Sequence, residues 1–281
     1  MKFFEKQHDL SLWVDRCRGA SESVGFVPTM GGLHEGHLSL IRAAKEKCDR
    51  VVASIFVNPT QFGPGEDFER YPRELQQDRE LLAGAGCDGL FYPTVEEIYP
   101  QGHQTRVSVE PLGSQLCGAF RPGHFEGVAT VVTVLLNLVR PHRIFLGLKD
   151  YQQFILLRQM VGDLGLGVVV EGVSTVREAD GLALSSRNRY LDREGRERAL
   201  GLYRAMEAVS EAWQGGERNP EALEGVGRQV LVASGIDRID YVAVRDSRTL
   251  GPWNLDSTSP QLLIAAFVDG VRLIDNRLLT S

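Results

Sequence analysis

The chain has few cysteines, and they are scattered. Its 281 residues include four of them, Cys17, Cys48, Cys87 and Cys117, and none belongs to a C-x-x-C pair. This spacing indicates neither a zinc site nor a disulfide framework. A reducing cytoplasm is therefore the expected location.

Long hydrophobic runs and an excess of positive charge are also missing. The most apolar run, 128–139, is too short to span a bilayer and contains threonine and asparagine. No long apolar stretch follows the basic residues near the N-terminus, so no signal peptide is expected. The net charge of −6 disfavours a large nucleic-acid-binding surface, but it allows one local nucleotide site.

The pattern that is present is an alternation of strands and helices. Hydrophobic residues make up 43% of the chain and charged residues 24%, as in an ordinary globular protein. Alternating strands and helices predict a parallel sheet covered on both faces, an α/β fold. The expected strands are 24–27, 51–57, 89–92, 144–146 and 168–170, and the expected helices are 34–48, 74–85, 128–139 and 151–161.

The character of the chain changes near residue 177. A charged, amphipathic helix is expected at 192–213, another helix at 221–233, and strands at 239–244 and 262–274. The last segment contains Asp269-Gly270, a pair typical of hairpin turns. We therefore expect a main domain at 1–177 and a smaller α+β domain, a lid, at 178–281.

The segment Pro28–Leu40, P-T-M-G-G-L-H-E-G-H-L-S-L, follows the first of these strands. Its glycines let the backbone approach a ligand closely, and His34 and His37 share one face of a helical turn. A helix start attracts phosphate, and two imidazoles there can donate hydrogen bonds to phosphate oxygens. The alternative is a glycine-rich turn with two surface histidines. A zinc site is less favoured because no third ligand is evident.

Two more polar segments follow predicted strands. Asn58 and Gln61 come after strand 51–57, and their amides suit a substrate with hydroxyl and carboxylate groups. Lys149 and Asp150 come after strand 144–146 and suit phosphate and ribose hydroxyls or a metal. Taken alone, a polar turn and a surface ion pair explain these segments better. Because ligands bind beyond the carboxyl ends of parallel strands, all three segments are candidates for one shared site.

The segment Leu182–Asn188, L-A-L-S-S-R-N, lies at the expected domain junction. Two hydroxyls and a guanidinium side by side make a phosphate clamp, and a junction loop can close over a ligand. A helix-capping Ser-Ser with a solvated arginine explains the segment equally well. The segments Asp67–Arg73 and Cys117–Gly127 are distinctive too, but neither is given a catalytic role.

With these residues in view, the chain closely resembles the pantothenate synthetase (pantoate–β-alanine ligase) family. The resemblance runs through Pro28–Leu40, Val57–Arg73, Cys117–Gln153 and Thr175–Leu191, and more weakly through Ile239–Leu250. Several separate motifs in the family's order make it specific. An isolated H-x-G-H motif would indicate only the wider nucleotidyltransferase group.

The resemblance implies a ligase of pantothenate and coenzyme A biosynthesis that works in two steps. The carboxylate of (R)-pantoate attacks the α-phosphate of ATP, which gives pantoyl adenylate and diphosphate; the amine of β-alanine then gives pantothenate and AMP. The resemblance further implies Mg²⁺ with the ATP, a Rossmann-like N-terminal domain and a homodimer, with no nucleic-acid or membrane partner. Such a site must neutralise phosphate charge, align the reactants and exclude water.

The same resemblance implies the roles of individual residues. The catalytic set is His34, His37, Lys149 and Arg187, with His37 as the proton donor. Pantoate and β-alanine would be held by Asn58, Gln61 and Gln153. The ATP-binding residues would be Met30, Gly31, Gly32, Leu33, His34, Glu35, Gly36, His37, Gly147, Leu148, Lys149, Asp150, Val176, Leu184, Ser185, Ser186 and Arg187. No protein ligand of magnesium is assigned.

The chain departs from the family pattern at Gly32, Leu146, Leu148 and Leu184, but no charged or hydrogen-bonding group is lost. The main rival is another H-x-G-H enzyme, either a nucleotidyltransferase acting on a phosphorylated substrate or an aminoacyl-tRNA synthetase. The glutamines disfavour a nucleotidyltransferase that acts on a phosphorylated substrate. The acidic net charge and the short chain disfavour an aminoacyl-tRNA synthetase. A nucleotide-binding module without activity is the rival from a different class.

Overall fold

The computed structural model describes residues 1–256 and 259–280. These residues form two compact units. The first contains Met1–Leu148 and Leu156–Ser174, and the second contains Lys149–Ile155 together with the described chain from Thr175 onward. The division into domains at 1–177 and 178–281 stays a prediction.

The first unit is built on a six-stranded sheet in the order β1-β4-β3-β2-β5-β6, in which every pair of neighbours is parallel. The expected α/β fold is thereby confirmed. Its elements are β1 (Lys2–Phe4), α1 (Gln7–Gly19), β2 (Val24–Thr29), α2 (Glu35–Lys47), β3 (Arg50–Ile55), η1 (Pro59–Gln61, a 3-10 helix), α3 (Leu75–Gly84), β4 (Gly89–Phe91), α4 (Val95–Ile98), α5 (Cys117–Phe120), α6 (His124–Val139), β5 (Arg143–Gly147) and β6 (Val169–Val173). The 3-10 helix η2 (Leu148–Asp150) and α7 (Tyr151–Asp163) run across the division between the units.

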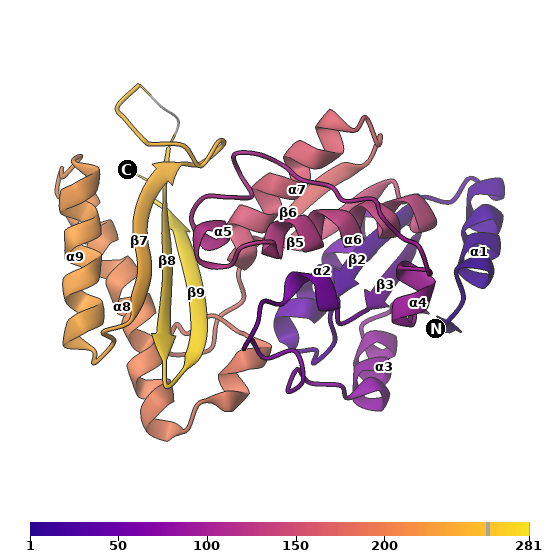
Figure 1. Ribbon diagram of the computed structural model, residues 1–281, viewed down its shortest axis with the longest axis horizontal. Coiled ribbons are helices and arrows are strands. Elements are labelled where there is room, and N and C mark those ends of the chain that lie inside the picture. The colour runs from indigo at the N-terminus through magenta and orange to yellow at the C-terminus, as the bar shows by residue number, and fades with distance from the viewer. Residues whose placement is uncertain (257–258, 281) are drawn as a thin grey trace. The chain divides into compact units, whose positions relative to one another are not determined.

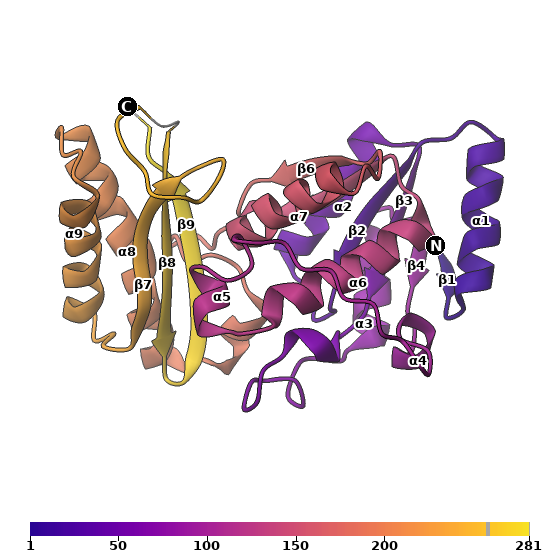
Figure 2. The same ribbon diagram turned by 45° about the horizontal axis from the view of Figure 1, so that its top comes forward.

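Helices cover both faces of this sheet, as Figures 1 and 2 show. The helices α2 and α3 pack together on one face, and α1 and α6 pack together on the other. The central strands are almost wholly apolar because both of their faces are buried, as is usual in parallel sheets. On the α2 face the core includes Val27, Ile41, Ala53 and Leu90, none of which is exposed to solvent.

The order of the strands places a switch point beside β2. The chain runs outward from β2 through β3 to β4, and then returns to β5 on the other side of β2. The carboxyl ends of β2, β3 and β5 therefore meet at one edge of the sheet. In open α/β sheets this edge, near the switch point, is where ligands bind.

The second unit contains a three-stranded antiparallel sheet in the order β7-β8-β9, and α8 and α9 lie along one face of it (Figure 1). Its elements are η3 (Ser186–Tyr190), α8 (Arg193–Gln214), α9 (Pro220–Ala233), β7 (Ile239–Asp246), β8 (Pro260–Val268) and β9 (Val271–Leu278). Asp269 and Gly270 have φ values of 51° and 78°. The predicted hairpin turn is therefore confirmed.

Several boundaries and elements differ from the sequence-based expectation. The strand expected to end before Pro28 continues as β2 to Thr29, and Pro28 pairs in register with Ser54 of β3. Because β5 pairs only with Gly25 and Phe26, Pro28 lies where β2 has a neighbour on one side, and a strand tolerates proline there. The strand expected at 51–57 ends at Ile55, and β1 and α1 were not predicted.

Within residues 1–256 and 259–280, none of the helices is both long and apolar enough to cross a bilayer.

Candidate active site

A tight glycine turn joins β2 to α2 at the switch-point edge. Gly31 and Gly32 have φ values of 84° and 61°, in the left-handed region that favours glycine. A Cβ on Gly31 would lie 3.0 Å from Oδ2 of Asp78 and 3.1 Å from Cγ2 of Ile55. The turn therefore needs glycine at this position both for its backbone conformation and for space.

A buried carboxylate from α3 holds this turn in place. Asp78 is 2% exposed, and its two oxygens accept the backbone N–H groups of Gly32 and Leu33 at 3.0 and 2.8 Å. These bonds fix the direction in which the chain enters α2. Sequence reasoning missed Asp78 because it lies 45 residues from Leu33 and no local signal connects the two.

The two histidines of the H-x-G-H motif cap the start of α2 through their own rings. Nδ1 of His34 accepts the N–H of Gly36 at 3.1 Å, and Nδ1 of His37 accepts the N–H of His34 at 3.3 Å. The ring centroids are 4.1 Å apart. Since each Nδ1 is an acceptor, the neutral rings carry their protons on Nε2. The helix start thus has two imidazole N–H donors beside its positive dipole end, which suits phosphate.

The turn after β3 is held by a dense set of hydrogen bonds around Asn58. This side chain is 1% exposed, and its Nδ2 donates to Oε1 of Gln61 and to the carbonyl of Gly127, both at 3.1 Å. Its Oδ1 accepts from the hydroxyls of Thr60 and Tyr99, each at 2.9 Å. Burial raises the pKa of Tyr99, so its hydroxyl keeps the proton it donates. Asn58 therefore fixes the shape of η1 and the side chain of Gln61.

Gln61 connects the two turns. Its Nε2 donates to Sδ of Met30 at 2.9 Å, and Met30 begins the glycine turn after β2. Within the first unit, the structure thus brings together Met30–His37 and Asn58–Gln61, as expected from the ends of neighbouring strands. Gly147 ends β5 at the same edge of the sheet.

Leu148 is the last residue of this part of the first unit, and the other predicted residues, from Lys149 onward, lie in the second unit. The carbonyl of Lys149 accepts the Nδ2–H of Asn276 at 2.8 Å, and Oδ1 of Asn276 accepts from Nε2 of Gln261 at 2.8 Å. Asp150 is exposed and Gln153 is half-buried in the first turn of α7. The β8–β9 hairpin thereby fixes the backbone of the lysine segment.

The Ser-Ser-Arg segment lies against the strand-like segment that contains Val176. The N–H of Leu184 donates to the carbonyl of Val176 at 3.0 Å, and Oγ of Ser185 caps η3 by accepting the N–H of Arg187 at 3.2 Å. Ser186 is 9% exposed. The structure therefore brings Val176 and 184–187 together within the second unit.

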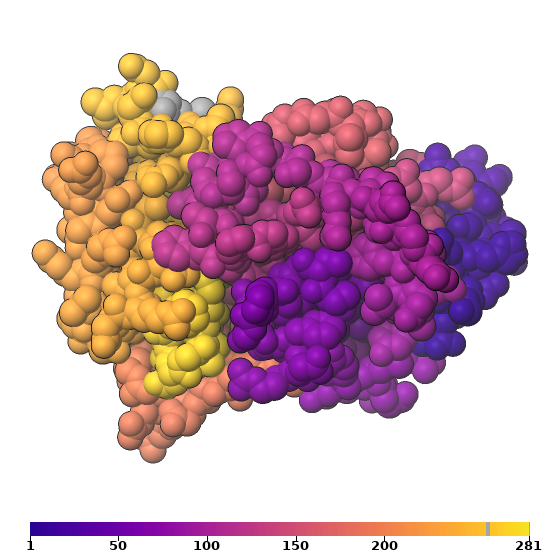
Figure 3. Space-filling model, viewed as in Figure 1, coloured from indigo at the N-terminus to yellow at the C-terminus, as the bar shows by residue number. Residues whose placement is uncertain are grey.

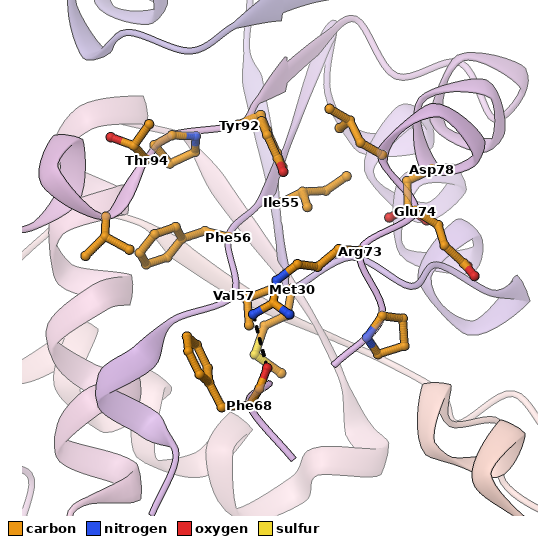
Figure 4. Close-up of a pocket in the computed structure, with 14 residues that line it drawn as sticks. Met30, Ile55, Phe56, Val57, Phe68, Arg73, Glu74, Asp78, Tyr92 and Thr94 are labelled. Atoms are coloured by element: carbon orange, nitrogen blue, oxygen red, sulfur yellow. Dashed lines mark hydrogen bonds between the residues drawn. The ribbon is translucent and has the colours of Figure 1, made fainter. Parts of the chain in front are cut away.

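A cavity of about 200 Å³ opens beside the glycine turn, between the ends of β3 and β4 and the segment 68–75 (Figure 4). Met30, Phe56, Phe68 and Tyr92 line it, and Arg73 reaches across to donate to the carbonyl of Phe68 at 3.1 Å. Of the site residues expected from the sequence, Met30 alone lines this cavity among the described residues.

The described residues contain no cluster of three or more His, Cys, Asp or Glu side chains arranged to hold a metal ion.

A parallel α/β sheet whose switch-point edge carries an H-x-G-H helix start defines a nucleotide-dependent enzyme of the nucleotidyltransferase type. The model of the pantoate-β-alanine ligase family matches residues 2–278, and the chain belongs to this family. It is therefore an amide-forming ligase that joins pantoate and β-alanine with ATP to make pantothenate.

Individual relatives match over nearly their whole length. A pantothenate synthetase of Magnetococcus marinus is 54% identical over 281 residues, which cover 99% of this chain and 96% of the relative. The crystal structure of pantothenate synthetase from Thermus thermophilus superposes with a TM-score of 0.94 at 49% identity and covers 100% of both chains. The pantoate-β-alanine ligase of Francisella tularensis, complexed with "beta-gamma ATP" and β-alanine, has a TM-score of 0.84 at 35% identity over 100% of this chain and 98% of its own.

Proposed function

We propose that the chain makes pantothenate in two steps on one site, with pantoyl adenylate as the intermediate. The observation that carries this proposal is the hydrogen bond between Gln61 and Met30. It joins a phosphate-binding helix start to a turn that presents an amide side chain suited to a hydroxy acid. An acid activated by ATP needs these two kinds of group side by side.

The helix start of α2 binds and stabilises the phosphates. The Nε2–H groups of His34 and His37 donate to phosphate oxygens, and their hydrogen bonds strengthen as charge develops during transfer. His37 acts as the proton donor. The remaining residues of Met30–His37 contact ATP through a backbone that Asp78 holds in place.

Both units supply the other ATP contacts. Lys149 neutralises phosphate charge as a mobile point charge, and Asp150 lies near the ribose. From the first unit, Gly147 and Leu148 also lie near the ribose. The backbone at Val176 contacts adenine. The clamp is completed by Leu184, Ser185, Ser186 and Arg187, of which Arg187 binds phosphate bidentately.

Gln61 and Gln153 hold pantoate, and Gln61 also lies near β-alanine. Asn58 acts differently from them. Its amide donates two hydrogen bonds and accepts two from other side chains and backbone, which uses its whole hydrogen-bonding capacity, whereas each amide atom of Gln61 makes one such bond. We propose that Asn58 serves substrate binding by holding Gln61 rather than by touching the substrate.

ATP and β-alanine as ligands are supported by the complex of the Francisella relative. We propose that Mg²⁺ enters with ATP, where it neutralises phosphate charge. A homodimer is proposed from the family resemblance. A cytoplasmic location is proposed from the cysteines, since all four are buried and none forms a disulfide.

An omission assay tests this function. AMP and diphosphate should accumulate over many turnovers only when ATP, pantoate and β-alanine are present together. Stable transfer of a nucleotidyl group to a phosphorylated acceptor would instead support the rival nucleotidyltransferase function. ATP binding in calorimetry without pantothenate formation at high enzyme concentration would support an inactive binding module.

A further inference from the structure

The segment that begins α6 contacts the backbone of the turn that carries Gln61. Nδ1 of His124 lies 2.7 Å from the carbonyl oxygen of Gln61, and Nη2 of Arg121 donates to the same oxygen at 3.4 Å. Nη1 of Arg121 lies 3.1 Å from Nε2 of His124. Both side chains come from the R-P-G-H sequence, which has no role in the proposed catalysis.

These distances fix the tautomer of His124. A carbonyl oxygen only accepts, so Nδ1 of His124 must carry the proton that it donates to Gln61. A guanidinium only donates, so Nε2 of His124 must be the acceptor for Arg121. The ring is therefore neutral and protonated on Nδ1, the reverse of the H-x-G-H histidines.

Arg121 is itself held in place by Glu66. Its Nε and Nη2 donate to the two oxygens of Glu66 at 2.6 Å each, a bidentate pair in which the Arg121 side chain is 14% exposed. Burial raises the pKa of Glu66, but the hydrogen bonds and charge of Arg121, together with smaller contributions that include the backbone N–H of Gly63, lower it overall. Figure 3 shows the segments near residues 65 and 120 side by side on this face of the first unit.

The turn is thus held on two sides. Asn58 and Met30 contact the side chain of Gln61, whereas His124 contacts its carbonyl. Since η1 is a single turn of three residues, its backbone has few other bonds that could fix the direction of the amide.

We propose that His124, kept in its Nδ1–H tautomer by the Arg121–Glu66 pair, is a positioning residue that sets the backbone of Gln61 and thereby the affinity for pantoate. This inference rests on the proposed role of Gln61 in holding pantoate. It makes His124 act through Gln61, and it gives the Glu66–Arg121 pair a function beyond stability.

Three substitutions of His124 test the direction of the hydrogen bond. His124→Ala removes the donor, and we expect the KM for pantoate to rise roughly tenfold, with the KM for ATP changed less than about twofold. His124→Asn places an amide N–H near the position of Nδ1–H, and we expect it to restore most of the affinity. His124→Gln, which places its amide near Nε2, should not restore it.

His142→Ala is the matched control. Nδ1 of His142 accepts a backbone hydrogen bond from Val24 at 2.9 Å, at the opposite end of β2, so its loss should lower stability without changing the KM for pantoate. Equal pantoate KM values for the alanine and asparagine variants of His124 would overturn the proposal, as would a parallel rise in the KM for ATP.

Gln61→Ala and the double variant with His124→Ala separate this proposal from the proposed function. If Gln61→Ala leaves the KM for pantoate unchanged, the assigned role of Gln61 is wrong. If Gln61→Ala raises it and His124→Ala adds a full, independent increase to the double variant, the positioning role is wrong. In nitrogen NMR of the intact enzyme, we expect the Nδ1–H tautomer of His124 and its loss in Arg121→Ala. A proton on Nε2 in the unsubstituted enzyme would refute the network itself.

Discussion

Replacing Gly127 with alanine should damage the substrate-binding turn through one misplaced methyl group. A Cβ at this position in α6 would lie 2.5 Å from the carbonyl oxygen of Thr60 and 2.8 Å from the nitrogen of Gln61. Close carbon–oxygen contacts are about 3.3 Å, so η1 and α6 must separate by roughly 0.8 Å. The helix cannot easily retreat, because ten of its 16 residues are buried.

The expected cost follows from two terms. Overpacking of this kind costs about 1–3 kcal/mol, and the hydrogen bond from Asn58 to the carbonyl of Gly127 weakens by up to about 1 kcal/mol more. We therefore expect the free energy of unfolding to fall by about 1–4 kcal/mol in urea denaturation. The KM for pantoate should rise more than the KM for ATP, because η1 is the element that moves.

Gly162→Ala is the control for this substitution. Gly162 lies in α7, and no heavy atom is within 4 Å of its added Cβ. Alanine there should leave both KM values unchanged and stabilise the protein by up to about 1 kcal/mol, since glycine is costly inside a helix. If Gly127→Ala matched this control in both measurements, the close approach of α6 to η1 would be refuted.

Three further predictions concern the other parts of the molecule. His37→Ala and Lys149→Ala should each lower the rate of adenylation roughly a hundredfold to a thousandfold with unchanged circular dichroism; near-normal rapid-quench rates in both would contradict the phosphate site. Asn276→Ala should raise the KM for ATP severalfold, because the carbonyl of Lys149 loses its partner, and an unchanged value would contradict that role. Hydrogen bonds from Arg277 lower the pKa of Glu207 to about 2, so their stabilisation is present at neutral pH and is lost as pH falls from about 4.5 to 2. In that pH range, the free energy of unfolding of Glu207→Gln should depend less on pH than that of the unsubstituted protein. An unchanged pH dependence would contradict a stabilising Glu207–Arg277 pair.

Most of the fold could be predicted from the pattern of apolar residues. Buried parallel strands appear in the sequence as short apolar runs, and polar turns follow their ends. The missed helix α1 carried a usable signal, because Leu10, Trp13, Val14 and Cys17 recur with helical spacing and are buried.

The candidate site could be predicted only as separate segments. The H-x-G-H residues lie together in the sequence, and the positive dipole end of a helix start explains why they suit phosphate. The residues that hold the site in place are far from it in the sequence. Asp78 binds Gly32 from 46 residues away, and His124 contacts Gln61 from 63 residues away. Such contacts depend on how helices pack on the sheet, which no local pattern encodes.

The exchange of labelled diphosphate into ATP tests the central claim most directly. The two-step account predicts that the enzyme, ATP, Mg²⁺ and pantoate incorporate label into ATP without β-alanine. It also predicts that Gln61→Ala raises the pantoate concentration needed for half-maximal exchange. Exchange that requires β-alanine, or exchange that proceeds without pantoate, would contradict an adenylating site built from the Met30–His37 turn and Gln61.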